Sequence, residues 1–162
     1  ENGCRTIVPP DDNPHVCPPP GSPLVAWPQI DPGRLYYLEP HGPYGPASVA
    51  DGAWPAWQFD AMRRVRAQAP DVSVHGEIFS PFTQFMELLD YTTGLMALMD
   101  DEAKVKACLD RLADGAIELG RGQARAGAHA VLISSAFAGA GLISRDHYST
   151  FVLPYDATSF DS

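Results

Sequence analysis

Apolar side chains recur at every third or fourth position in the chain after residue 55, which is the spacing of one buried helix face. The first such stripe consists of Phe59, Met62, Val65 and Ala69. Pro70 ends this helix, because the residue before a proline avoids the helical region of backbone space. Residues 72–79 follow with the sequence VSVHGEIF, which is typical of a β-strand. The pattern therefore predicts a helix followed directly by a strand.

A second unit begins immediately after this strand. Ser80 and Pro81 are a typical helix start, with serine as the N-cap and proline in the first helical position. The apolar stripe that follows consists of Phe82, Phe85, Leu88 and Leu89. Gly94 is expected to close the unit.

A longer helix is predicted from Asp100, which suits the N-cap, to Gly127, which is a natural C-cap. Asp101 and Glu102 favour the positive end of its dipole. Its buried stripe consists of Val105, Leu109, Leu112, Ala116 and Leu119. Residues 130–135, AVLISS, are short and nearly all apolar, so they predict a parallel strand covered on both faces.

A last helix is expected to begin at Ser144, to carry Tyr148, Phe151 and Val152, and to end before Pro154. The order helix, strand, helix, helix, strand, helix predicts an α/β fold of parallel strands with flanking helices. These strands are too few to close a sheet, and open strand edges are costly. We therefore expect the chain to be part of a larger fold, or to gain strands from a second copy as a homodimer or by strand exchange.

Residues 1–55 contain most of the prolines, which exclude long regular elements. Disordered segments are poor in aromatic residues, but this one contains Trp27, Tyr36, Tyr37, Tyr44 and Trp54. We therefore predict an irregular segment that packs on the βα units of residues 56–162. Within it, residues 34–39 are compatible with a strand, and the loop 41–46, HGPYGP, is either a substrate lid or a rigid surface turn.

The formal net charge is −9, from 20 acidic and 11 basic residues. No Lys/Arg cluster offers a phosphate-binding face, so we expect no nucleic-acid partner. No apolar stretch approaches the ~20 residues of a membrane span, so no membrane partner is expected. The three cysteines lack CxxC spacing, and Cys108 lies in a predicted helix as a small hydrophobic residue. A Cys4–Cys17 disulfide stays an alternative, and the cytoplasm is the expected compartment.

Five motifs follow one another between residues 55 and 156. They are SPFT at 80–83, DDEAKVK at 100–106, AGA at 126–128, LIS at 142–144, and Phe151 with LPY at 153–155. In this order and spacing the chain resembles the uroporphyrinogen decarboxylase superfamily. The resemblance implies a (β/α)8 TIM barrel, a fold that typically needs ~250 residues, with this chain as part of it and supplying the central units.

The resemblance implies two chemistries. Uroporphyrinogen decarboxylases are carboxy-lyases that remove carboxylates from the acetate arms of a tetrapyrrole without a cofactor. The related methylcobamide-dependent methyltransferases use zinc to activate a thiol and take a methyl group from a corrinoid. We expect a tetrapyrrole or corrinoid-type small molecule as ligand. Decarboxylase-like activity is the first hypothesis, corrinoid methyl transfer the second, and a non-catalytic scaffold or binding remnant the third.

In parallel barrels the chemistry lies at the carboxyl ends of the strands. The candidate catalytic residues are Glu77, Glu87 and Ser135, and the candidate substrate-binding residues are Phe79, Ser80, Gln84, Ser134 and Phe137. By the resemblance, Glu87 stands where the decarboxylases have a tyrosine, and Ala136 where they have a serine. No two histidines have ligand spacing, so no metal site is expected within this chain.

These assignments have alternatives. Glu77 is either a base or substrate-orienting carboxylate, or a strand-end carboxylate paired to an arginine. Ser80 is either a site residue or only an N-cap. We expect one cavity to be bordered by Glu77, Ser80, Glu87, Ser134 and Ser135.

Overall fold

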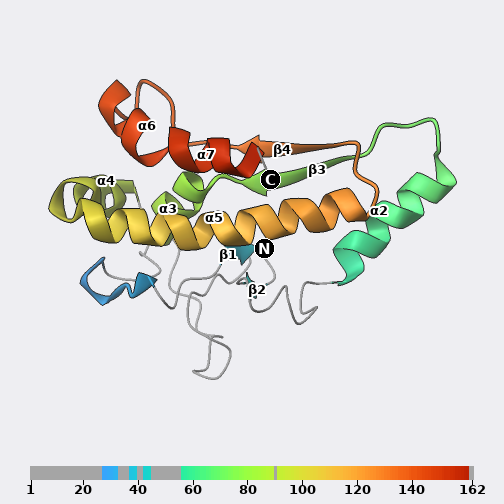
Figure 1. The fold of residues 1–162 in the computed structure, drawn as a ribbon, viewed down its shortest axis with the longest axis horizontal. Helices are drawn as coiled ribbons and strands as arrows, with labels where there is room; N and C mark the ends of the chain where they lie inside the picture. The colour runs from blue at the N-terminus through green and yellow to red at the C-terminus, as the bar shows by residue number, and fades with distance from the viewer. Residues whose placement is uncertain (1–26, 33–36, 40–41, 45–55, 90, 161–162) are drawn as a thin grey trace.

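The computed structural model describes residues 27–32, 37–39, 42–44, 56–89 and 91–160 (Figure 1). Before residue 56 its elements are a short 3-10 helix, η2 (Trp27–Gln29), and two strands, β1 (Tyr37–Glu39) and β2 (Gly42–Tyr44), which pair antiparallel. The later elements are α2 (Ala56–Gln68), β3 (His75–Phe79), α3 (Pro81–Leu89), α4 (Tyr91–Asp100), α5 (Glu102–Arg125), β4 (Ala130–Ser134), α6 (Arg145–Phe151) and α7 (Leu153–Phe160).

The two strands β3 and β4 are parallel neighbours, so the predicted α/β fold class is confirmed. Ile78 lies opposite Ile133, and Phe79 lies opposite Ser134. The long helix α5 runs along both strands (Figure 1). Both strands point toward the left-hand end of the molecule in Figure 1, where α3, α4 and α6 gather. The carboxyl ends of the strands therefore meet at this end.

The predicted apolar stripes of α3 and α5 are confirmed as the core. Every residue of both stripes is fully buried. The main core contains the α3 stripe and the first three residues of the α5 stripe, together with Phe151 and Val152 at the end of α6 and Ile30 just after η2. A smaller cluster of Ile78, Ala116 and Leu119 joins α5 to the sheet. Burial of these side chains supplies most of the stabilisation that holds the helices on the strands.

Side chains and glycine fix the helix ends near the predicted positions. The helix α5 begins one residue later than predicted, because the side chain of Asp101 accepts the backbone N–H of Lys104 at 3.0 Å. Gly127 follows its C-terminus with a φ of 99°, a left-handed conformation that favours glycine. Ser144 caps α6 as predicted, since its Oγ accepts the N–H of His147 at 3.1 Å.

Two helices, α4 and α7, were not predicted. Gly94 does not close the preceding unit but lies buried inside α4. A Cβ at this position would meet the Sδ of Met86 at 2.7 Å, so the glycine permits the close approach of α4 to α3. Pro154 does not follow the last helix but is the second residue of α7. In a first turn its missing N–H costs no helical hydrogen bond.

Strand limits and exposure also differ from the prediction. The strand β3 begins at His75, three residues later than predicted, and Val72 is exposed. The strand β4 ends at Ser134, and Leu132 is 60% exposed, so β4 is not covered on both faces within the described part of the chain. Val65 is also exposed, because α2 contacts α5 through the ring of Phe59 near its other end.

The first third of the chain is partly described. Trp27 in η2 packs on α3 and α5: its ring meets Phe85 edge-on at a centroid distance of 5.8 Å, and the Nζ of Lys104 lies 4.4 Å from its centroid. The strand predicted over 34–39 contains β1, but residues 33–36 lie outside the described ranges. Of the loop 41–46, residues 42–44 form β2, and 41, 45 and 46 lie outside them as well. The lid and the division at residue 55 stay predictions.

None of the helices in the described ranges is both long and apolar enough to cross a lipid bilayer.

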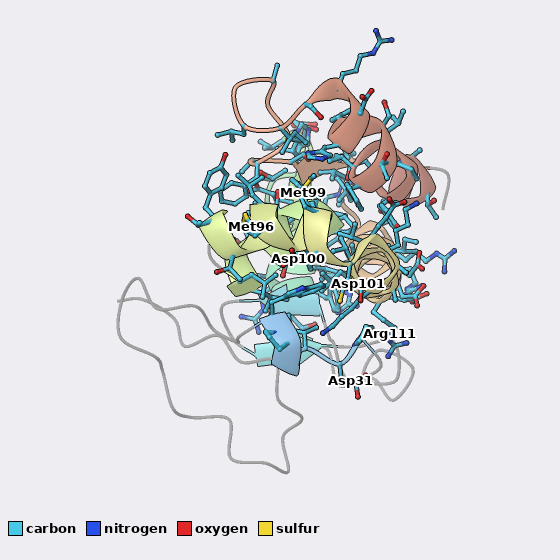
Figure 2. All side chains as sticks on the ribbon, turned by 90° about the vertical axis from the view of Figure 1, so that its left-hand side faces the viewer. Asp31, Met96, Met99, Asp100, Asp101 and Arg111 are labelled. Atoms are coloured by element: carbon cyan, nitrogen blue, oxygen red, sulfur yellow. The ribbon has the colours of Figure 1, made fainter. Side chains whose placement is uncertain are left out.

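Truncation of the core should destabilise the protein far more than truncation of its surface. Leu112 is fully buried on α5, whereas Met99 on α4 is 71% exposed (Figure 2). We expect Leu112→Ala to lower the free energy of unfolding by about 2–5 kcal/mol, and Met99→Ala to change it by less than about 0.5 kcal/mol. Urea denaturation of both variants measures this difference. Equal losses would mean that α5 does not pack as described.

Candidate active site at the strand ends

The carboxyl ends of β3 and β4 are joined by a cluster of hydroxyl groups. The N–H of Ser80 donates to the carbonyl of Ser134 at 2.9 Å, which extends the parallel pairing one residue beyond β3. The Oγ of Ser80 accepts the N–H of Thr83 at 3.1 Å, so Ser80 also caps α3 as predicted. We call the side chains of Ser80, Thr83 and Ser135 the strand-end cluster.

Thr83 lies at the centre of this cluster. Its Oγ1 donates to the carbonyl of Ser134 at 3.3 Å and accepts the N–H of Ala136 at 3.0 Å. It also lies 3.0 Å from the Oγ of Ser80. Ser80 and Thr83 are both fully buried. Because unpaired buried polar groups are costly, these bonds fix the end of β4 against the first turn of α3.

Ser135 extends the cluster toward α7. Its Oγ lies 3.2 Å from the Oγ of Ser80, and its hydroxyl also forms a hydrogen bond with the carboxyl group of Asp156. Burial raises the pKa of Asp156 above its ordinary value, and the hydrogen bond to Ser135 opposes this effect. Asp156 is thus a titratable group in contact with the strand-end cluster.

The two strands present their remaining candidates on the face away from α5. Ile78 is buried toward α5, and side chains alternate along a strand, so Glu77 and Phe79 point to the opposite face. Ser134 lies opposite Phe79 in the parallel register. Glu77 is exposed. This face therefore carries a carboxylate, an aromatic ring and a hydroxyl near the strand ends.

The helix α3 supplies two further candidates. Thr83 and Glu87 are four residues apart, so Glu87 lies one turn beyond the strand-end cluster on the same side of the helix. Glu87 is half-buried. Gln84 is 2% exposed, and its backbone N–H donates to the carbonyl of Ser80 at 3.0 Å.

The structure thus brings some of the predicted residues together and leaves others apart. Ser80 is hydrogen-bonded both to the carbonyl of Ser134 and to the hydroxyl of Ser135. Phe137 lies farther along the loop after β4, where its ring is 6.2 Å from that of Tyr91. The single cavity expected to join Glu77 and Glu87 to the three serines stays a prediction.

A cavity of about 240 Å³ lies elsewhere, between the sheet, α5 and α7. Its lining is mostly apolar and includes Ile78, Ile117, Val131 and Ile133. It lies on the α5 face of the sheet, so it is separate from the face that carries Glu77 and Ser134.

The described residues do not form a zinc site. Within the ranges that the structure describes, no three His, Cys, Asp or Glu side chains gather in a geometry that could hold a metal ion. Cys108 is fully buried, and burial raises the pKa of its thiol to about 12. A thiolate there would be costly, so Cys108 is a core residue and not a nucleophile or a ligand.

Comparison with known proteins places this arrangement in a family. The family model for uroporphyrinogen decarboxylase (URO-D) matches residues 46–162. The chain therefore belongs to the uroporphyrinogen decarboxylase family, and the resemblance noted in the sequence is confirmed. No curated protein sequence matches the chain.

A solved structure shares the fold. It is a methyltransferase from Methanosarcina mazei, with a TM-score of 0.61 and 21% sequence identity. The match covers 64% of the present chain and 31% of that chain. The present chain thus spans about a third of the length of that structure, and at this identity the likeness concerns the fold.

Sequence reasoning missed Thr83 and Asp156 as members of the site. For Thr83 a signal exists, because a serine N-cap followed three residues later by a hydrogen-bonding side chain resembles a capping box. Asp156 has no such signal, since its contact with Ser135 depends on how α7 returns to the end of β4.

Removal of the Thr83 hydroxyl should remove the hydrogen bonds that link α3 to the end of β4 and so destabilise the protein. Thr83→Val keeps the shape of the side chain but leaves the N–H of Ala136 and the hydroxyl of Ser80 without this partner. We expect a loss of about 1–3 kcal/mol in the free energy of unfolding. The matched control is Thr92→Val on the exposed side of α4, expected within about 0.5 kcal/mol of wild type. If chemical denaturation shows equal losses in the free energy of unfolding for the two variants, the Thr83 hydroxyl does not stabilise the fold as described.

The Cys108 thiol should resist alkylation in the folded protein. Its burial and raised pKa both remove the reactive thiolate at pH 8. We expect peptide mapping after iodoacetamide treatment to show Cys108 unmodified in the native protein and modified in urea. Labelling of Cys108 under native conditions would show that α5 opens readily.

Proposed function

We propose that this chain forms part of the substrate site of a decarboxylase-like enzyme that acts on the acidic side chain of a tetrapyrrole. The observation that carries the proposal is the hydrogen-bonded strand-end cluster at the carboxyl ends of two adjacent parallel strands. This is where barrel enzymes bind their substrates. Membership of the uroporphyrinogen decarboxylase family supports the choice of substrate class.

The roles follow from the positions of the side chains. Loss of CO2 from an acetate arm breaks a carbon–carbon bond and leaves a carbon that must take up a proton. Glu87 is half-buried one turn from the cluster, so we assign it the delivery of that proton. We assign the hydroxyl of Ser135 to a hydrogen bond with the substrate. Glu77 on the open face of β3 orients the macrocycle.

Binding would draw on the remaining candidates. Phe79 and Phe137 offer aromatic surfaces to a flat ring. Ser80, Gln84 and Ser134 are held by hydrogen bonds, and we assign them to the polar wall behind the ring. Two glutamates would repel an acidic arm. We therefore expect cationic side chains from other parts of the protein to complete the site.

A second candidate is zinc-dependent methyl transfer from a corrinoid. Two points favour it: by the sequence resemblance Glu87 stands where the decarboxylases have a tyrosine, and the similar solved structure is that of a methyltransferase. A zinc ion would activate the accepting thiol. Because the described residues offer no zinc site, its ligands would have to come from the rest of the protein.

Activity assays distinguish these functions. The purified protein is incubated anaerobically with uroporphyrinogen, and the oxidised products are separated by their number of carboxylates. We expect porphyrins with fewer carboxylates to accumulate. Consumption of methylcobalamin with zinc and a thiol, in place of decarboxylation, would select methyl transfer. Inactivity in both assays would select a non-catalytic scaffold.

Substitutions at the site should then reduce the reaction. We expect Glu87→Gln to lower kcat by about a hundredfold, because the amide cannot deliver a proton. Glu118→Gln on α5 is the matched control, since Glu118 forms a surface ion pair with Arg121 at 2.8 Å. It should retain wild-type activity. An active Glu87→Gln variant would show that another group supplies the proton.

A further inference from the structure

The outward face of α4 carries two methionines that no other described element covers. Met96 is 56% exposed and Met99 is 71% exposed, and because they are three residues apart they share one side of the helix. Single exposed apolar side chains are ordinary, but neighbouring ones on one helix face mark a candidate docking surface. The hydroxyl of Tyr91, at the start of α4, donates to the carbonyl of Leu142 at 3.4 Å, and both side chains are partly exposed. The apolar face therefore continues toward the loop after β4.

Carboxylates border the methionines at the C-terminal end of α4. Asp100 is the last residue of α4, Asp101 is the N-cap of α5, and both are exposed. Figure 2 looks at this end of the molecule and shows both aspartates next to the methionines, with Asp31 on the same side. We call Met96, Met99, Asp100 and Asp101 the α4 surface. It combines apolar side chains with negative charge.

Asp100 occupies a position that is unfavourable for an acid in the isolated helix. The C-terminus of a helix carries a partial negative charge, and the carboxylate of Asp101 follows directly. Asp101 gains a hydrogen bond as a cap, since it accepts the N–H of Lys104 at 3.0 Å. The side chain of Asp100 forms no hydrogen bond or ion pair with another described residue. The nearest cations on α5 have other partners: Lys104 donates to the carbonyl of Trp27 at 2.9 Å, and Arg111 pairs with Asp114 at 3.9 Å.

A single kind of ligand would relieve both features of this surface. An apolar ligand side chain would cover the methionines, and a neighbouring cation would pair with the aspartates. Anionic lipid and nucleic acid have the wrong charge, and a second copy of the chain would bring identical carboxylates together across a twofold axis. Methionine adapts its shape to different apolar partners. Side chains three residues apart on a helix also form a ridge that packs into the groove of another helix.

We propose that the α4 surface docks a basic amphipathic helix of a partner protein. Apolar side chains of that helix pack on Met96 and Met99, and its lysines or arginines pair with Asp100 and Asp101. The surface lies at the end of the molecule where the strand ends meet (Figure 1), so the bound partner lies on the same side as the candidate site. The inference goes beyond the proposed function and does not depend on it.

Binding of a synthetic peptide to the intact protein tests this proposal. The probe is a fluorescein-labelled helical peptide with leucines on one face and lysines on the other, measured by fluorescence anisotropy. We expect Met96→Gln/Met99→Gln to weaken binding by about tenfold. We expect Asp100→Asn/Asp101→Asn to weaken it by about fivefold and to make it less sensitive to salt. Asparagine at position 101 keeps the helix cap.

The matched control is Asp71→Asn/Val72→Gln. It removes one exposed acid and one exposed apolar side chain between α2 and β3, at the opposite end of the molecule (Figure 1). This variant should bind the peptide as the wild type does. A peptide with glutamate in place of lysine should not bind. If the wild type fails to bind the lysine peptide, or if all variants bind it equally, the proposal is overturned, because any attraction then reflects only the net charge of the chain.

Oxidation by hydrogen peroxide, mapped by mass spectrometry, tests whether the surface is open in the intact protein. Met96 and Met99 should be oxidised in the protein alone and protected by the lysine peptide, whereas Met86, which is 1% exposed, should resist oxidation in both. Protection of Met96 and Met99 without peptide would show that the rest of the protein covers this face, and the proposal fails. It also fails if light scattering shows a dimer that Met96→Gln/Met99→Gln dissociates, because a second copy is then the occupant.

Discussion

The arrangement of this chain depends on the hydrogen bonds that the hydroxyl of Thr83 forms with the backbone of Ser134 and Ala136. Parallel pairing brings the ends of β3 and β4 together, and the N–H of Ser80 donates to the carbonyl of Ser134, but the N–H of Ala136 lies beyond the paired residues. The Oγ1 of Thr83, in the first turn of α3, accepts this N–H and also donates to the carbonyl of Ser134. The direction in which α3 leaves the sheet is thereby fixed relative to β4, and α4 and α5 then pack on α3 through fully buried apolar side chains.

The same atoms that close the fold also form the candidate site. Ser80 caps α3 and is bonded to Ser135, so its position is set by the helix and not by a flexible loop. A site built on such groups is preorganised, because the bonds that hold the strands also hold the candidate hydroxyls.

Much of the fold could be predicted from local pattern. The α5 stripe and the caps at Ser80, Ser144 and Gly127 obey periodicity and capping rules that act within a few residues. The errors arose where a tertiary contact gives a residue another role. Gly94 looked like a helix end, but its missing Cβ lets α4 approach Met86. Pro154 looked like a stop signal, but it occupies a first turn.

The site could be predicted only in part, for the same reason. Strand-end position selected Ser80, Ser134 and Ser135, which do lie together. The contribution of Asp156 could not be predicted, because it depends on the path of the chain through α6 and α7 back to β4. Exposure along β4 was also misjudged, since apolar composition alone does not reveal which face a neighbouring element covers.

The central claim is that the ends of β3 and β4 border the bound macrocycle. A crystal structure of the intact protein with a carboxylated porphyrin tests it most directly. The account predicts that a carboxylated arm of the ring lies within hydrogen-bond distance of Ser135, with Glu87 beside the same arm. A porphyrin bound instead in the apolar cavity between the sheet, α5 and α7 would contradict it.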